Sequence, residues 1–364
     1  MTALPPVERR PTGGAGARVL RVLILAACVG VLAWWVRSLG PRRILEAALD
    51  ADPRWLALSL CAVASRYLIW AAKWQRMMRR TGRVGFGTTL RAILSGTLLN
   101  LVTPSAKLAG GVLRAAIVQR STGWRMALAY GWSVADQVTN VLGDFLLGGL
   151  LAAAAALSMP PSAGRRALLL SGIAAVALPV FAVALRGRTL RLVRRPGVVK
   201  VAARLTPARF REPGPDGPVP GWLEPVLAPL LRTGSAWYEV SSDIALGAAS
   251  WFSLCVANAM VFRALGVDAP LFGIATALVL AAFAGTLTGT IGGIGATEVV
   301  LIGLYARLGI PPEAAAAAAL VHRGTYYALS VLAGSLALVV GSRRRRAEPP
   351  SEILGRIDGN IPNE

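Results

Sequence analysis

Cysteine, histidine and acidic residues are scarce in this chain. Its 364 residues include three cysteines, one histidine and 18 Asp and Glu residues, against 39 Lys and Arg residues. Cys28, Cys61 and Cys255 lie far apart inside apolar runs, and no CxxC or Cys/His cluster occurs. We therefore expect neither a disulfide framework nor a metal site. The sequence also contains no P-loop motif for a nucleotide, and we expect no cofactor.

Charge is low overall, and it is mostly of one sign. Only 16% of the residues are charged, whereas about a quarter is typical of a soluble domain. The formal net charge of +21 accompanies 55% hydrophobic residues and a mean hydropathy of +0.56. A basic nucleic-acid-binding domain needs Lys and Arg on a folded face, but here they fall between long apolar runs. This composition excludes a soluble globular protein, a disordered protein and an ordinary nucleic-acid binder, and it predicts a polytopic membrane protein.

The apolar runs predict an all-α transmembrane domain over residues 19–340. A spanning helix needs about 20 apolar residues. Six runs are long enough, at residues 19–37, 54–74, 126–157, 165–185, 241–264 and 314–340. Two further apolar regions, 86–120 and 270–309, are interrupted by Gly, Pro and Thr, and we interpret each as a helical hairpin. Leu25–Cys28 resembles a lipoprotein cleavage box, but the apolar run before it is short and continues beyond it, so 19–37 is interpreted as a retained span.

Lys and Arg residues are concentrated in segments that face the cytoplasm if the N-terminus is inside. These segments include 73–83, the Pro-rich linker 186–240 and the basic start of the tail 341–364. Because cytoplasmic loops carry an excess of Lys and Arg, we expect a multi-pass protein of the cytoplasmic (inner) membrane with both termini in the cytoplasm. We expect the tail 1–18 and the end of the tail 341–364 to be disordered. The linker is interpreted as either a charged connection or a segment lying on the inner leaflet.

The two hairpins give the chain an internal symmetry. Their second arms, 106–119 and 296–309, have 14 residues each, which as helices extend about 21 Å, less than the roughly 30 Å of bilayer hydrocarbon. We therefore expect broken, re-entrant hairpins instead of complete crossings. Each hairpin with its two flanking spans forms one unit, and the two units would insert in opposite directions. Such an inverted repeat is a recurring transporter plan, although a chance arrangement of apolar segments gives the same pattern.

Six ionisable residues lie deep in the apolar segments, where an unpaired charge is costly. They are Arg66, Arg114, Asp136, Asp144, Glu298 and Arg323. We expect them to face a cavity or one another. Asp136, Asn140 and Asp144 recur every four residues and therefore share one helix face. Two interpretations of these acids stay open, as structural partners of Arg66 or Arg114 and as proton-coupling groups.

The first hairpin carries candidate headgroup ligands. Pro104 interrupts the helix after Asn100, and a second helix starting near Ser105 would point free amide groups into the turn, where an anion could bind. Lys107 and Arg114 are seven residues apart and share one face of that second helix. The pattern predicts a site for an anionic headgroup, or alternatively a helix-breaking turn with snorkelling cations.

The second hairpin is rich in glycine. Residues 285–298 contain five Gly and four Thr, a composition that does not form a stable lone helix. Irregular backbone is tolerated in a membrane only where protein or a wet cavity surrounds it. We therefore expect Gly292, Gly293 and Gly295 to line the substrate cavity, with helix packing as the alternative.

Glu298 and Arg323 are expected to form an ion pair. Glu298 falls in the first turn of the helix after the glycines, where the helix dipole favours a carboxylate. Arg323 lies near the middle of the last span, and Glu298 is its obvious counterion. The neighbouring His322 is expected to pack or to form hydrogen bonds, because no second metal ligand accompanies it.

These residues resemble the motifs of the flippase-like integral membrane family related to the transmembrane region of lysylphosphatidylglycerol synthases. The resemblance covers about residues 20–340. The family's first motif is matched by Asn100, Pro104, Lys107, Gly110 and Arg114. The later motif, Gly-Gly-x-Gly-x-x-Glu and then Arg with aromatics, is matched by Gly292, Gly293, Gly295, Glu298, Arg323, Tyr326 and Tyr327. The chain departs from the family at Gly111, which replaces a usual Glu, and after Asp136, where Gln137 and Asn140 replace an Arg and an acid.

The resemblance implies movement of a charged or glycosylated lipid headgroup between leaflets. We expect a translocase for an anionic or glycosylated phospholipid or a polyprenyl-phosphate-linked lipid, driven by ion coupling or by downhill flow. Lys107, Arg114 and Arg323 would hold the phosphate, and Glu298 would pair with Arg323 when no substrate is bound. The hairpins would act as gates. The expected partners are membrane lipids with anionic headgroups and a membrane enzyme of lipid or cell-envelope synthesis, with no nucleic acid.

We do not expect an enzyme. Aminoacyl-lipid synthases of the related type carry a large soluble catalytic domain after the membrane part, and this sequence ends shortly after its last span, so no aminoacyl transfer is expected. Two alternatives stay open. One is a membrane-embedded transferase that uses a lipid-phosphate donor, and the other is a non-transporting partner of a membrane enzyme.

Overall fold

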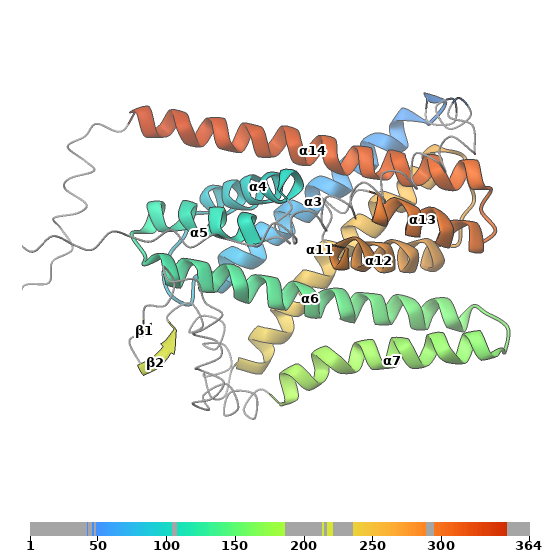
Figure 1. Cartoon of the computed structure of the whole chain (residues 1–364), viewed down its shortest axis with the longest axis horizontal. Coiled ribbons are helices and arrows are strands. Elements are labelled where there is room, and N and C mark those ends of the chain that lie inside the picture. Colours follow the sequence, from blue (N-terminus) through green and yellow to red (C-terminus); the bar gives the residue numbers. More distant parts are fainter. Residues whose placement is uncertain are drawn as a thin grey trace, which may run out of the picture.

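The computed structural model describes residues 42, 46, 49–103, 108–185, 213–214, 217–220, 236–288 and 295–347. In these ranges the chain is almost entirely helical, which confirms the all-α prediction. The helices are α3 (Pro53–Met78), α4 (Phe86–Val102), α5 (Leu108–Thr122), α6 (Met126–Leu157), α7 (Ala163–Ala184), α11 (Ala236–Ala264), α12 (Leu271–Leu287), α13 (Ala296–Arg307) and α14 (Pro312–Ala347) (Figure 1). A small antiparallel strand pair, β1 (Pro213–Gly214) and β2 (Gly217–Pro220), lies within the expected linker.

Five helices are long and apolar enough to cross a membrane. They comprise Pro53–Met78, Met126–Leu157, Ala163–Ala184, Trp237–Ala264 and Pro312–Val340. They correspond to five of the six predicted spans, and the first predicted span, 19–37, lies outside the described residues. Large apolar side chains are exposed along α7 and the second half of α14, as expected for helix faces that meet lipid. The chain is therefore a multi-pass membrane protein.

Helix α3 begins at a well-defined cap and runs further than the apolar run suggests. The side chain of Asp52 accepts a hydrogen bond from the backbone N–H of Arg54 at 2.8 Å, and Pro53 occupies the first helical turn, where it needs no donor. The helix continues beyond residue 74, where the sequence places the end of the span, to Met78. Lys73, which the sequence places in a cytoplasmic loop, is consequently fully buried inside the bundle.

Helices α3 and α11 form a long antiparallel pair that crosses the bundle obliquely (Figure 1). At one end, the backbone N–H of Asp52 donates to the carbonyl oxygen of Ala264 at 2.8 Å. Further along, the hydroxyl of Ser59 donates to the carbonyl oxygen of Ala257 at 3.0 Å. The second contact lies seven residues later in α3 and seven residues earlier in α11 than the first, so the two helices are antiparallel.

At the opposite end, ion pairs join the two helices. Asp243 of α11 is fully buried and forms ion pairs with Arg76 and with Arg80, the latter at 2.7 Å. Glu239 lies 3.2 Å from the Nε of Arg80. The last turn of α3 and the residues just after it are thus joined to the first turns of α11 by a network of two arginines and two carboxylates, in which Arg80 contacts both acids.

Two short helical hairpins, α4–α5 and α12–α13, fill the space between the long helices (Figure 1). Their arms have 17, 15, 17 and 12 residues, all below the roughly 20 needed for a perpendicular crossing. The arms of α4–α5 meet at glycine. A Cβ on Gly110 would lie 2.3 Å from the carbonyl oxygen of Gly96, so only the absence of a side chain allows this approach.

The remaining contacts fall into matching pairs. Helix α14 packs on α4 and α13, and α6 packs on α12 and α5. In Figure 1, α6 and α14 lie on opposite sides of the hairpins and run in opposite directions. Helix α7 packs against α6, with close backbone contact at Gly149 and Gly172. Near the start of α14, the five successive residues Ala315 to Ala319 are all 0% exposed.

The close approach at Gly110 gives a prediction for hairpin stability. Replacing Gly110 by Ala should lower the free energy of unfolding by about 1–3 kcal/mol, because the added methyl group clashes with backbone atoms that cannot rotate away. The adjacent Gly111→Ala variant is the matched control, since its nearest neighbour would be a Tyr130 ring atom at 3.8 Å. Thermal unfolding of both variants in detergent measures the difference. Equal stability of the two variants would contradict the tight α4–α5 contact.

Candidate functional site

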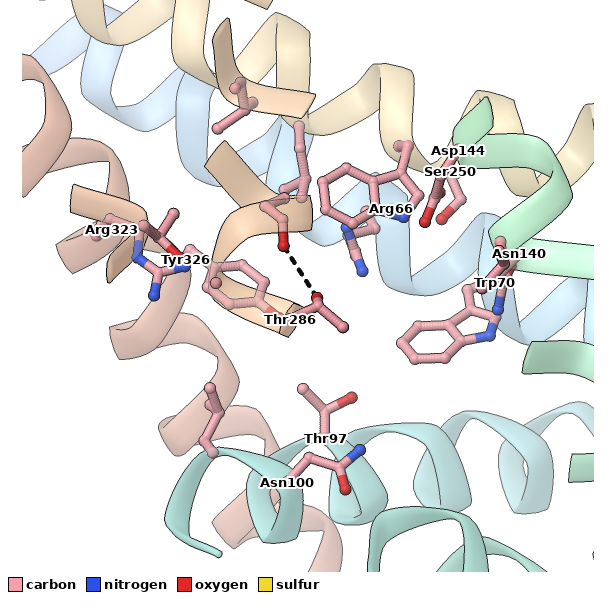
Figure 2. Close-up of a pocket in the computed structure, with 18 of the residues that line it drawn as sticks. Arg66, Trp70, Thr97, Asn100, Asn140, Asp144, Ser250, Thr286, Arg323 and Tyr326 are labelled. Carbon is pink, nitrogen blue, oxygen red and sulfur yellow. Dashed lines mark hydrogen bonds between the residues drawn. The ribbon is translucent and has the colours of Figure 1, made fainter. Parts of the chain in front are cut away.

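A cavity of about 190 Å³ lies inside the bundle, bounded by α3, α4, α6, α11, α12, α13 and α14 (Figure 2). Part of its wall is polar. The polar side chains include Arg66, Asn100, Asn140, Asp144, Thr286 and Arg323. Four of the residues singled out from the sequence, Arg66, Asn100, Asp144 and Arg323, therefore meet at one place, although they lie on four different helices. Ionisable side chains that face a cavity among membrane-spanning helices are typical of a substrate pathway.

Arg66 lies in an aromatic cage at the cavity wall. Its Cζ atom is 4.7 Å from the ring centroid of Trp251, 5.6 Å from that of Trp70 and 5.8 Å from that of Tyr326. The residue is only 8% exposed, and its Nε and Nη1 atoms are buried without a hydrogen-bond partner. Figure 2 shows the guanidinium pointing into the open space between Trp70 and Thr286. The cage attracts the cation through the ring faces, but it offers no acceptor to its N–H groups.

Behind the cavity, Asp136 of α6 holds two buried cations. Its carboxylate lies 2.7 Å from Nη1 of Arg114 on α5 and 3.1 Å from Nζ of Lys73 on α3. The indole N–H of Trp70 donates to the same carboxylate at 2.8 Å, and Lys73 also donates to Oδ1 of Asn140 at 2.6 Å. Of the interpretations considered for Asp136, pairing with Arg114 is therefore present. Arg114 and Asp136 are not among the residues of the cavity wall.

The expected pair of Glu298 and Arg323 is present. Oε1 of Glu298 lies 2.7 Å from Nε of Arg323, and Oε2 accepts from the backbone N–H of Gly295 at 2.7 Å. Gly295 caps α13 with a φ of 84°, a conformation that favours glycine. Arg323 also donates to the hydroxyl of Tyr327, whose ring centroid lies 4.5 Å from the guanidinium carbon. Glu298 therefore fixes both the start of α13 and the arginine that reaches the cavity.

Asn100 connects the first hairpin to the cavity. Its Oδ1 accepts a hydrogen bond from the backbone N–H of Gly110 at 2.8 Å, and the residue forms part of the cavity wall. The family motif residues Asn100 and Gly110 are thus brought together across the hairpin. Three other residues expected at the site, Lys107, Gly292 and Gly293, lie outside the described residues.

Trp70, Trp251 and Lys73 contribute to the site but were not recognised as site residues from the sequence. One pattern could have indicated two of them, because Arg66, Trp70 and Lys73 recur at intervals of four and three residues and therefore share a face of α3. A charged residue one turn from a tryptophan deep in an apolar span is unusual on a lipid-facing surface. Trp251 lies on another helix, and no spacing within the sequence connects it to Arg66.

Asp136 is the shared partner of two buried cations, and this gives a prediction for stability. Replacing Asp136 by Asn leaves two cations buried without a carboxylate, which should cost about 3–5 kcal/mol in the free energy of unfolding. Arg114→Gln should cost clearly less, because Lys73 and Asp136 still form a neutral pair. Denaturant unfolding in detergent compares the two, with Asp268→Asn in the exposed α11–α12 loop as the control. A loss for Arg114→Gln as large as that for Asp136→Asn would contradict the assignment of Asp136 as the shared counterion.

Comparison with known proteins places the chain in a family of membrane proteins. Residues 18–334 match the family described as the lysylphosphatidylglycerol synthase TM region. A UPF0104 membrane protein of Pyrococcus horikoshii is 21% identical over 338 residues, which cover 90% of this chain and 98% of the relative. A UPF0104 membrane protein of Methanothermobacter thermautotrophicus is 26% identical over 340 residues, covering 88% of this chain and 92% of the relative. The match extends over the helices that build the cavity, and the chain belongs to the lysylphosphatidylglycerol synthase TM region family.

Proposed function

We propose that this protein binds a lipid with an anionic headgroup in the central cavity and moves it between the two leaflets of the membrane. The observation that carries the proposal is a cavity lined by two arginines, Arg66 and Arg323, between membrane-spanning helices and the two short hairpins. Charged side chains at such a depth are costly unless they serve a substrate or an ion. The family description supports the proposal, since it names the membrane part of an enzyme of phospholipid modification.

The size and the edge of the cavity fit a headgroup better than a whole lipid. Its volume of about 190 Å³ is below the roughly 300–1,000 Å³ of pockets that enclose a drug-sized ligand. Val141 forms part of the wall and is 46% exposed, so apolar surface adjoins the polar interior at this edge. A phosphate-containing headgroup would occupy the cavity while the acyl chains stay in the surrounding lipid.

We also propose that the protein is an inverted repeat. The first unit would be α3, α4, α5 and α6, and the second α11, α12, α13 and α14. The packing supports this, because exchanging the units converts the contact of α14 with α4 into that of α6 with α12, and the contact of α5 with α6 into that of α13 with α14. The opposite directions of α3 and α11, and of α6 and α14, support it too (Figure 1). Inverted repeats commonly place the substrate site where the units meet.

In this proposal the hairpins are re-entrant gates, and both chain termini lie on the cytoplasmic side of the inner membrane. The short arms of both hairpins support the first point, and the basic residues in 79–83 and 341–346 support the second. Glu298 holds Arg323 when the cavity is empty, and a bound phosphate would compete for the same guanidinium. The residues of the cavity serve binding and movement, and the protein carries out no chemical step on the lipid.

Translocation in reconstituted vesicles tests this function. Purified protein in vesicles containing a phosphatidylglycerol with a fluorescent label on one acyl chain should make inner-leaflet lipid accessible to an impermeant quencher. Ala282→Phe adds a ring to the cavity wall and should reduce the rate at least about tenfold, because the headgroup no longer fits. Leu280→Phe is the matched control, since Leu280 lies two residues away on α12 and is 48% exposed.

Three outcomes of this experiment decide between the candidate functions. Translocation is supported if inner-leaflet lipid is quenched with the wild-type protein and with Leu280→Phe but much more slowly with Ala282→Phe. A modified lipid product without transfer between leaflets would support a membrane-embedded transferase instead. Neither transfer nor product would overturn the proposed function and favour a role as partner of another membrane enzyme. Thermal unfolding of Ala282→Phe in detergent checks that the variant is folded.

A further inference from the structure

Arg66 differs from the other buried cations around the cavity. Lys73 and Arg114 share Asp136, and Arg323 pairs with Glu298. Among the residues that the structure describes, no carboxylate lies within ion-pair distance of Arg66, and two of its nitrogen atoms have no hydrogen-bond partner. The side chain is nevertheless more than nine-tenths buried and points into the cavity (Figure 2).

A guanidinium in this state is ready to receive an anion. Burying an ion without a partner carries a large desolvation cost, which aromatic faces offset only in part. The cage of Trp70, Trp251 and Tyr326 contacts the guanidinium but leaves Nε and Nη1 without an acceptor, and the oxygen atoms of a phosphate are acceptors of the kind that these groups lack. The energy released on binding is greatest where the anion supplies the hydrogen bonds that the protein does not.

The ionisable groups at the cavity indicate how many negative charges the ligand carries. Within the described part of the wall, the charged residues are Arg66, Arg323 and Asp144, with His322 counted as neutral, so this part has one positive charge in excess. Including the groups directly behind the wall gives the same excess, because Glu298 adds one negative charge while Asp136 with its two cations adds one positive charge. A ligand with a single negative charge makes the described site neutral.

We infer that Arg66 is the primary phosphate-binding residue of the cavity and that the ligand is a singly charged phosphodiester. This inference rests on the proposed function, since it takes the cavity to be the headgroup site. It assigns Arg66, and not Arg114, as the anchor, because the charge of Arg114 is already matched by Asp136. A monoanionic glycerophospholipid and a polyprenyl phosphate carrying one sugar share this chemistry. A dianionic phosphomonoester, a zwitterion and a cationic aminoacylated headgroup each leave the site charged.

Binding of short-chain lipids to the detergent-purified full-length protein tests the assignment of Arg66. Native mass spectrometry should detect dioctanoyl phosphatidylglycerol bound to the wild-type protein. Arg66→Gln should weaken its affinity at least about tenfold, because the phosphate loses the arginine that has no other counterion. Arg66→Lys keeps the charge but not the fork and should give an intermediate affinity. Arg79→Gln is the matched control, since Arg79 is an exposed arginine at the end of the same helix. Unchanged affinity in a folded Arg66→Gln protein would overturn the assignment.

The charge of the ligand is tested by changing the charge of the wall. The wild-type protein should prefer dioctanoyl phosphatidylglycerol over dioctanoyl phosphatidic acid, phosphatidylcholine and lysyl-phosphatidylglycerol. Asp144→Asn adds one positive charge to the wall and should shift the preference toward the more highly charged phosphatidic acid by roughly tenfold. The same preference in Asp144→Asn as in wild type, or equal binding of all four lipids by wild type, would overturn the inference about charge.

Two further probes separate the sources of the phosphodiester. Soluble glycerophosphoglycerol tests the headgroup alone, and farnesyl phosphomannose tests a polyprenyl-linked diester. The inference is supported if dioctanoyl phosphatidylglycerol or farnesyl phosphomannose binds tightly to the wild-type protein and weakly to Arg66→Gln. If glycerophosphoglycerol binds as tightly as these lipids, the cavity is a site for a free anion and the inference is overturned. If wild type translocates lipid in vesicles and Arg66→Gln binds and translocates it equally well, the proposed function stands and this inference is refuted. Failure of the inference can therefore be distinguished from failure of the proposed function.

Discussion

The carboxylate of Asp136 is the interaction on which the arrangement of the first half of the protein depends. It joins three helices through two buried cations, with Lys73 on α3, Arg114 on α5 and the acid itself on α6. A buried ion pair contributes little net stability compared with apolar packing, but its loss is expensive because the remaining charge has no solvent. The Arg114–Asp136 ion pair therefore ties the α4–α5 hairpin to α6, and the Lys73–Asp136 pair ties α3 to the same carboxylate.

Trp70 links this ion cluster to the cavity. Its indole N–H donates to Asp136, while its ring lies 5.6 Å from the guanidinium carbon of Arg66 and 5.3 Å from that of Arg114. One rigid side chain thus contacts a matched arginine on one side and an unmatched arginine on the other. Trp70 therefore lies between the ion cluster around Asp136 and the cavity wall at Arg66, and it contacts both.

Sequence reasoning identified the features that depend on local composition. The five described spans follow from apolar length alone, and the Glu298–Arg323 pair was found because few ions occur in the second half of the membrane domain. For Asp136 the sequence offered Arg66 or Arg114 as partner and did not include Lys73, because only the packing of α3 and α5 against α6 decides which cations reach the carboxylate. Lys73 was misplaced for a related reason. It follows an apolar run at the point where a loop is expected, and the helix continues past it.

The local sequence likewise does not indicate that Gly110 and Gly111 differ in how closely they pack. Both are helical glycines in the same motif, yet only the first faces the opposite arm of the hairpin at backbone distance. The aromatic cage of Arg66 is a third example, because Trp70, Trp251 and Tyr326 come from three helices that meet only in the folded protein. Composition and spacing therefore predicted which segments cross the membrane and which residues are costly there, while tertiary packing determines what each of those residues contacts.

The run from Ala315 to Ala319 has a consequence for how the sequence can diverge. Successive residues of a helix point about 100° apart, so five successive residues without exposure mean that protein surrounds α14 on every side at this level. Most membrane helices have a lipid-facing side on which side chains of many sizes are interchangeable. This segment has no such side, and enlarging any of the five methyl groups would push against a different neighbour. Evolutionary drift here is confined to residues no bulkier than alanine, whereas the exposed apolar positions in the second half of the same helix tolerate side chains of many sizes.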